Sequence, residues 1–112
     1  MSLQYIRWFP GDYLRDTLDL SLIEHGAYRL LLDHYYMHGS IPSEPDKLYR
    51  IVKAISDDEK ISVISVSKRF FYENGNGTLY NKRADKELQI SKDYSERQRE
   101  KGRLSAKVRW EK

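Results

Sequence analysis

Apolar residues recur at helical spacing in three stretches of this chain, and each stretch follows a serine. The first begins after Ser21 and ends at Gly39, and its apolar face consists of Ile23, Ala27, Leu30 and Leu31, widened by Tyr28, Leu32, Tyr35 and Tyr36. The second begins after Ser43, and its stripe is Leu48, Ile51, Val52 and Ile55. The third covers residues 61–70 and is rich in β-branched residues, which suit a strand as well as a helix.

A shared start signal favours a helix in all three places. The pairs Ser21/Glu24, Ser43/Asp46 and Ser56/Glu59 each place a hydroxyl three residues before a carboxylate. At a helix N-terminus, the hydroxyl accepts a hydrogen bond from a free amide and the carboxylate reaches back to the cap. Pro45 also suits a first turn because its missing N–H would have no intrahelical partner. We therefore expect three helices, including one over residues 61–70.

Residues 70–80 have the pattern of a β-hairpin. Aromatic and β-branched residues flank the turn residues 73–77, in which Asn and Gly tolerate a positive φ. Upstream, residues 5–9 could add an edge strand that ends at Pro10. A final helix is expected from Arg83, with Ala84 and Leu88 facing the body. Residues 91–103 contain no aliphatic side chain, so this stretch is predicted to be a projecting helix or disordered, with a break at Gly102.

Three helices followed by a hairpin is the order of a winged helix-turn-helix. The predicted fold class is mainly α with a small β-hairpin: a winged helix-turn-helix-like three-helix core plus a wing and a C-terminal projecting helix. The expected division is a winged-helix-like domain over residues 1–90 and a basic helix or flexible tail over residues 91–112. An isolated helical bundle that carries a hairpin is the competing architecture.

Composition limits the function classes. The 112 residues suit one domain, and 14 aromatic residues argue against wholesale disorder. The chain contains no Cys, which excludes disulfides, thiolate metal sites and a cysteine nucleophile. No apolar run is long enough for a membrane helix, and early charges such as Arg7 and Asp12 interrupt any signal peptide. We therefore expect a cytoplasmic protein with no membrane contact.

Charge is distributed unevenly along the chain. Residues 82–112 carry 11 Lys and Arg against 6 Asp and Glu, whereas residues 1–81 carry 9 against 11. A basic tail on a near-neutral body commonly indicates a polyanionic partner. A solvated helix of mixed charge explains the same composition equally well.

One block of residues is distinctive enough to suggest a family. It combines residues 8–13, Thr17 and residues 20–28, and continues through Leu30, Leu31, Tyr35, Tyr36, Gly39, Pro42, Phe70, Phe71, Asn81, Arg83, Glu87, Gly102 and residues 106–110. This pattern resembles a phage and prophage family of YdaU-like proteins, largely described as a domain of unknown function. The resemblance implies a role near phage DNA replication, and it implies that this chain corresponds to the N-terminal module of longer replication-initiation-like members. It carries over no catalytic residues.

Candidate catalytic and metal-binding groups have simpler explanations. His34 and His38 have a spacing that can serve a metal, but no third ligand shares their face. The acidic run 57–59 is explained by a helix start, and Asp12, Asp16 and Asp19 by the same reasoning. Gly75 and Gly77 lack the Lys-Ser/Thr of a phosphate loop, and no Ser/His/Asp spacing suggests a triad. We expect no enzyme activity, cofactor or metal.

Basic residues supply the candidate nucleic-acid interface. They fall on the second helix, at the end of the third helix, after the wing and along the tail: Lys47, Arg50, Lys53, Lys68, Arg69, Lys82, Arg83, Lys86, Arg97, Arg99, Lys101, Arg103, Lys107 and Arg109. Residues 57–59 oppose base reading, because the leading end of the third helix, which would enter the major groove, is acidic.

The leading hypothesis is a non-enzymatic module that binds DNA weakly, mostly through phosphates, in phage or prophage replication initiation. The alternative is a protein-interaction module that docks a helicase, a loader or another replication factor through an aromatic surface of Tyr35, Tyr36, Tyr49 and Tyr80. Self-association through the C-terminal helix is a further possibility, with Trp110 on a base or in a pocket of a second copy.

Overall fold

The computed structural model describes residues 6–110, with side chains described from residue 6 to residue 105. Its elements are, in order, α1 (Pro10–Asp16), α2 (Leu22–His38), β1 (Ile41–Pro42), α3 (Pro45–Val52), α4 (Asp57–Phe70), β2 (Tyr72–Glu73), β3 (Thr78–Tyr80) and α5 (Lys82–Trp110). The predicted fold class, mainly helical with a small β element, is confirmed. No described helix is long and apolar enough to cross a membrane.

Helix α2 lies at the centre of the core. It contributes Ala27, Leu31, Leu32 and Tyr35, and the other elements pack around it with Ile41, Leu48, Val63, Val66, Phe71, Leu79 and Ala84. Ile23 and Leu30 were expected on the same face of the helix. Both lie at its edge instead, and their side chains are more than 40% exposed. Ile61 also points outward, on the face of α4 opposite Val63 and Val66.

Two of the three predicted helix starts have the expected hydrogen bonds. The Ser21 hydroxyl accepts from the Glu24 amide at 3.1 Å while the Glu24 carboxylate accepts from the Ser21 amide at 2.9 Å. Ser56 and Glu59 form the same pair of bonds, at 3.1 and 2.8 Å. The start predicted at Ser43 is wrong by one residue, because Glu44 is the N-cap and makes no side-chain cap bond. Pro45 nevertheless occupies the first turn as expected.

The predicted hairpin is present as β2 and β3, and the third strand is β1. The sheet is antiparallel in the order β1-β3-β2, with Ile41 opposite Leu79 and Tyr72 opposite Tyr80. Gly75 and Gly77 both have a φ near +80°, which explains why glycine suits this turn. The helix order and the place of the hairpin are compatible with a winged helix-turn-helix, which remains an interpretation of this arrangement.

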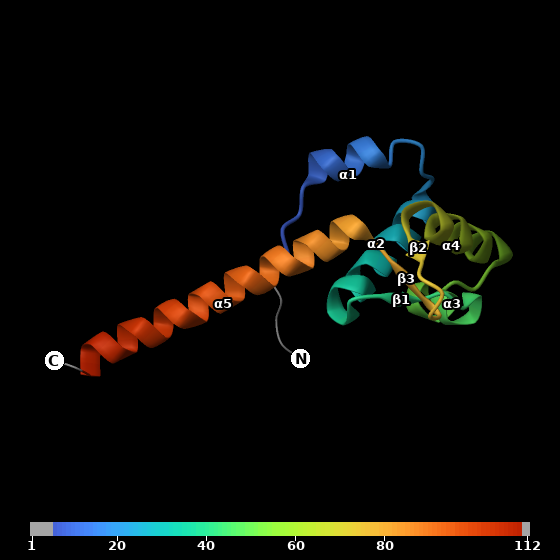
Figure 1. Ribbon diagram of the computed structural model, residues 1–112. Helices are drawn as coiled ribbons and strands as arrows, with labels where there is room; N and C mark the ends of the chain where they lie inside the picture. The colour runs from blue at the N-terminus through green and yellow to red at the C-terminus, as the bar shows by residue number, and fades with distance from the viewer. Residues whose placement is uncertain (1–5, 111–112) are drawn as a thin grey trace.

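The N-terminal segment does not form the predicted edge strand. Residues 6–9 lie outside any strand, and Pro10 starts helix α1 instead of ending a strand; Tyr5 lies outside the described residues. Proline favours the first helical turn, so the same residue fits both readings. Helix α1 buries none of its residues, and it lies near the start of α5 (Figure 1). We call residues 7–19, which include α1, the strap.

Helix α5 leaves the body as a long projection (Figure 1). Ala84 is 1% exposed and Leu88 packs against the core, as expected, and Ser91 is the last buried residue described on this helix. The predicted break at Gly102 is wrong, because α5 runs unbroken from Lys82 to Trp110. One glycine costs a helix only about 1 kcal/mol, which is insufficient by itself to end it.

A hydrogen-bond junction between Tyr35 and Asn81 sets where α5 begins. The Tyr35 hydroxyl accepts from the Asn81 amide at 3.0 Å and donates to the Asp85 carboxylate. The Asn81 side chain caps α5 by accepting from the Ala84 amide at 2.9 Å, and it donates to the carbonyl of Phe70 at 3.0 Å. One buried junction thus joins the centre of α2, the end of α4 and the start of α5.

Substituting Tyr35→Phe is expected to lower the free energy of unfolding by about 1–3 kcal/mol, because the buried Asn81 amide loses its acceptor. Chemical denaturation followed by circular dichroism measures this change. Tyr36→Phe is the matched control, since the Tyr36 hydroxyl makes no hydrogen bond to a described residue. Equal effects of the two substitutions would contradict the prediction.

Candidate nucleic-acid interface

The cations predicted to contact nucleic acid fall into two groups, those that form an ion pair with an acid and those that do not. Three are ion-paired, since Lys47 lies by Glu44, Arg69 by Asp19, and Arg83 by Asp12 and Asp16. The others whose side chains are described have no ion pair to a described residue: Arg50, Lys53, Lys68, Lys82, Lys86, Arg97, Arg99, Lys101 and Arg103. Lys107 and Arg109 belong to α5, but their side chains lie outside the described part.

Arg50, Lys53 and Lys60 form a patch that we call the α3–α4 basic cluster. These residues line one shallow depression together with Tyr49 and one acid, Asp46, and the Lys60 ammonium lies 5.5 Å from the centre of the Tyr49 ring. Lys53 ends α3 in the left-handed conformation, with φ of 59°. The chain therefore turns before Ile55, which is 84% exposed and does not continue the predicted apolar stripe.

The second unpaired group lies on the part of α5 beyond its last buried residue. We call residues 92–110 the α5 arm. Lys92, Arg97, Arg99, Lys101 and Arg103 are all exposed on it. They alternate with three acids over residues 92–105, so the arm is basic but mixed in charge.

The start of α4 is acidic, as the sequence indicated. Asp57 and Asp58 are exposed, whereas the Glu59 carboxylate accepts hydrogen bonds from the amides of Ser56 and Ile55. These bonds hold the pKa of Glu59 below its ordinary value. All three acids lie in the first turn of α4, as the helix-start explanation requires, and Asp57 and Asp58 have no ion pair to a described residue.

Arg69 and Arg83 hold the strap to the body through acids on or next to α1. The Arg69 guanidinium donates two hydrogen bonds to Asp19, at 2.8 and 2.9 Å. Arg83 donates to Asp12 at 2.8 Å and to Asp16 at 3.3 Å. We call these contacts the α1 clasp. The hydrogen bond from Arg69 lowers the pKa of Asp19, and the same bond raises the pKa of Arg69.

Aromatic rings also pack between the strap and the body. Tyr13 packs on Tyr28 at 5.9 Å between ring centres, and Tyr28 stacks on Phe70 at 4.1 Å. Burial raises the pKa of Tyr28 to about 12. The ring centres of Trp8 and Tyr13 lie 5.0 Å apart, and the Arg29 guanidinium lies 4.1 Å from the centre of the Trp8 ring.

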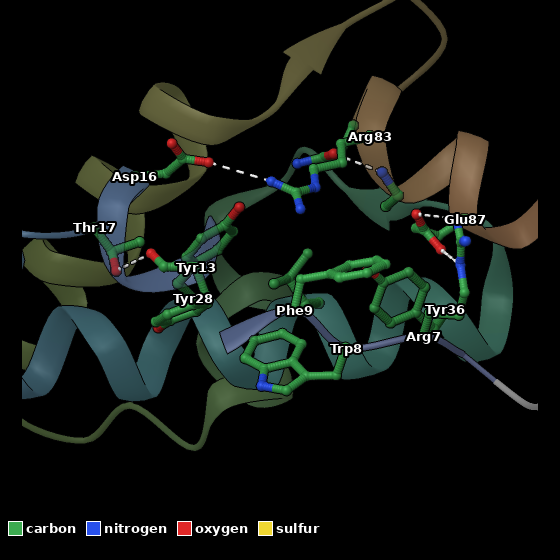
Figure 2. A pocket seen from close by; sticks show the side chains of 13 residues that line it. Arg7, Trp8, Phe9, Tyr13, Asp16, Thr17, Tyr28, Tyr36, Arg83 and Glu87 are labelled. Atoms are coloured by element: carbon green, nitrogen blue, oxygen red, sulfur yellow. Dashed lines mark hydrogen bonds and ion pairs between the residues drawn. The ribbon is translucent and has the colours of Figure 1, made fainter. Parts of the chain in front are cut away.

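A small cavity of about 60 Å³ lies beneath the strap, lined by both rings and charges (Figure 2). Arg7 closes one side through two 3.0 Å hydrogen bonds to Glu87, and Arg83 faces Asp16 on the other. An apolar cavity that holds benzene is about 150 Å³, so this space admits a few waters and no nucleobase.

The histidine and tyrosine candidates are placed differently from one another. The His34 and His38 rings lie 4.3 Å apart, and burial together with His38 lowers the pKa of His34. Among residues with described side chains, no three metal-ligating groups gather. Tyr35 was expected on an aromatic surface, but it is fully buried at the core junction.

Sequence reasoning could not separate paired from unpaired cations. The clasp joins residues 50, 67 and 71 positions apart, and no local pattern predicts such contacts. Lys60 was missed because it lies beside the acidic helix start. Its spacing of seven residues from Lys53, across a helix end, gives no periodic signal.

Comparisons with known proteins show a family but no assigned activity. A family described as "Protein of unknown function (DUF1376)" matches residues 4–89. The chain is also similar to "Uncharacterized protein YdaU" of Escherichia coli (strain K12), with 35% identity over 74 residues. That alignment covers 66% of this chain and 25% of the relative, so the chain matches about a quarter of that protein's length. No solved structure matches the chain.

The Asp19–Arg69 pair predicts a specific response to acid. Because the pKa of Asp19 is below the ordinary 3.8 in the fold, the pair stabilises the fold above that pH. The stabilisation is lost as the pH falls through the lowered value. The unfolding temperature of the Asp19→Asn variant should therefore fall less than that of the wild type when the pH is lowered from 5 to 2. Parallel profiles of the two proteins, measured by circular dichroism, would contradict the assignment.

Proposed function

Since the chain belongs to the DUF1376 family, whose description assigns no function, we propose its function from its own surface: it is a non-enzymatic DNA-binding module that contacts mainly phosphates. The α3–α4 basic cluster and the α5 arm make these contacts. The setting, phage or prophage replication initiation, is taken from the YdaU-like resemblance. In that setting, the module would position or load other replication factors on DNA.

The observation that carries the proposal is the grouping of the unpaired cations. Arg50, Lys53 and Lys60 converge on one depression, and five further cations project from the α5 arm before residue 106. A cation that already faces a carboxylate gains less from a phosphate than one that faces only water. Unpaired cations that gather in this way are therefore suited to neutralise phosphates and release counterions.

The order of the elements supports a winged-helix interpretation with an unusual contact face. Helices α2, α3 and α4 precede the β2–β3 hairpin, which takes the place of a wing. In helix-turn-helix proteins the recognition helix reads base edges with its N-terminal residues. Asp57 and Asp58 occupy that end of α4, so the proposed contacts lie at the end of α3 and along α5 instead. Binding of this kind is tolerant of sequence and sensitive to salt.

The double substitution Arg50→Gln/Lys53→Asn tests the α3–α4 basic cluster. Asn is chosen because it tolerates the left-handed backbone of position 53. Loss of two phosphate contacts should lower the slope of log affinity against log salt by about 1.8 on a 30-base-pair duplex. Fluorescence anisotropy over a salt series measures the slope.

The matched control is Arg29→Gln/Lys47→Gln, which removes the same charge from cations that already face acids outside the cluster. Its slope should stay close to that of the wild type. If both double variants lower the slope equally, net charge explains the binding and the cluster is not an interface.

Truncation after Lys92 tests the α5 arm while keeping the buried Ser91. The shortened chain should keep the unfolding temperature of its body and lose most of its DNA affinity and salt dependence, because five exposed described cations are reduced to one. Undiminished binding would make the arm a linker. Unfolding of the shortened chain would make the arm part of the structural core.

A protein-docking function is the second candidate, and three exposed leucines near one another in the chain favour it. Leu18 and Leu22, between α1 and the first turn of α2, are 82% and 88% exposed, and Leu14 on α1 is 58% exposed. Exposed leucines are typical of surfaces that meet another protein when they lie together. The tyrosines first considered for this role support it less, since Tyr36, Tyr49 and Tyr80 are each partly buried. Absence of DNA binding at low salt would favour this function.

A further inference from the structure

Arg69 and Arg83 present guanidinium groups in a geometry that suits phosphate as well as carboxylate. Arg69 offers two parallel N–H donors to the two oxygens of Asp19, at 2.8 and 2.9 Å. Arg83 places one donor on each of two carboxylates, Asp12 and Asp16. The planar guanidinium fork matches phosphate oxygens in the same two-pronged way.

We propose that Arg69 and Arg83 are two phosphate-binding sites that the carboxylates of the α1 clasp occupy until DNA displaces them. This inference rests on the proposed function, because DNA supplies the displacing phosphates. Asp12, Asp16 and Asp19 thus act as intramolecular competitors and lower the affinity of the resting protein.

Unpaired cations stand next to both arginines in the chain. Lys68 precedes Arg69 in the last turn of α4, and Lys82 precedes Arg83 in the first turn of α5, and both lysines are exposed. Lys86 adds a further exposed cation one turn along α5. When its carboxylate partner leaves, each arginine thus has an exposed lysine next to it in the chain, which adds to its attraction for a phosphate.

The clasp contacts can be exchanged without unfolding the strap. The Arg69 and Asp19 side chains are 43% and 68% exposed, and those of Arg83, Asp12 and Asp16 are each more than 40% exposed. Ion pairs this open to water are individually weak. Meanwhile the buried Thr17 and the Arg7–Glu87 pair keep the strap attached. Rotation of the acid side chains is therefore sufficient to release the arginines.

The test is a double-substitution cycle on the full chain, with a 30-base-pair duplex of mixed sequence as the probe. Asp19→Asn is measured alone and together with Arg69→Gln. The matched control is Asp33→Asn, which removes one charge from an exposed aspartate paired with Arg29, at 3.3 Å. Arg29 is not among the proposed phosphate contacts, so this control reports the effect of net charge alone.

D19N should raise DNA affinity about two- to fivefold above D33N, the ratio that matches an exposed ion pair. Its salt slope should stay equal to that of D33N, because Arg69 contacts a phosphate in the bound state of both proteins. In the Arg69→Gln background, the D19N and D33N variants should bind DNA with the same affinity. D12N/D16N tested with and without Arg83→Gln gives the same comparison for the second site. Unfolding temperatures confirm that every variant is folded.

The outcomes separate this inference from the proposed function. If the wild type binds DNA and D19N equals D33N, competition by the clasp is wrong while DNA binding stands. If D19N keeps its advantage without Arg69, a general field effect explains it and the phosphate site is wrong. If neither the wild type nor the clasp variants bind at low salt, both proposals fail. Binding by the clasp variants alone would overturn displacement by DNA, because the carboxylates would then block both sites even in its presence.

Discussion

The buried junction of Tyr35 with Asn81 is the contact on which the arrangement of this molecule depends. A single phenol hydroxyl on the central helix accepts the Asn81 amide and donates to Asp85, while Asn81 caps α5 and binds the end of α4. Burial raises the pKa of Tyr35, with the Asp85 hydrogen bond adding to the effect, so the hydroxyl stays protonated as a donor. The direction in which α5 leaves the body, and with it the place of the arm, follows from this junction.

The charges of the body are arranged in space, not merely along the chain. Residues 1–81 carry a slight excess of acid, but several of those acids gather on or beside the strap and neutralise Arg69 and Arg83. Others, such as Glu24 and Glu59, are bound to backbone amides at helix starts. What remains unpaired is enriched in Lys and Arg at the end of α3 and along α5. A nearly neutral domain can therefore present distinctly positive surfaces.

Local chemistry made part of this fold predictable. The two serine–glutamate caps and the Asn/Gly turn act within a few residues, and the structure has all three. The errors lie where distant parts of the chain decide. Pro10 fits a strand end or a helix start, and only packing of α1 across the body selects the helix. The local sequence does not show that Tyr35 is buried, because the partners of its hydroxyl, Asn81 and Asp85, lie 46 and 50 residues further along the chain. The division of the cations has the same origin, because the partners of Arg69 and Arg83 come from the other end of the sequence.

The length of the α5 arm has a consequence for how molecules would share one DNA. At 1.5 Å per residue, a helix from residue 92 to residue 110 reaches about 27 Å, or about eight base pairs of duplex. A body seated on DNA with its arm laid along the backbone would cover far more of the duplex than the body alone. The arm would thus act as a spacer that keeps the next body at a distance. Packing of copies along DNA would then be governed by a segment that lies beyond the last buried residue described on α5.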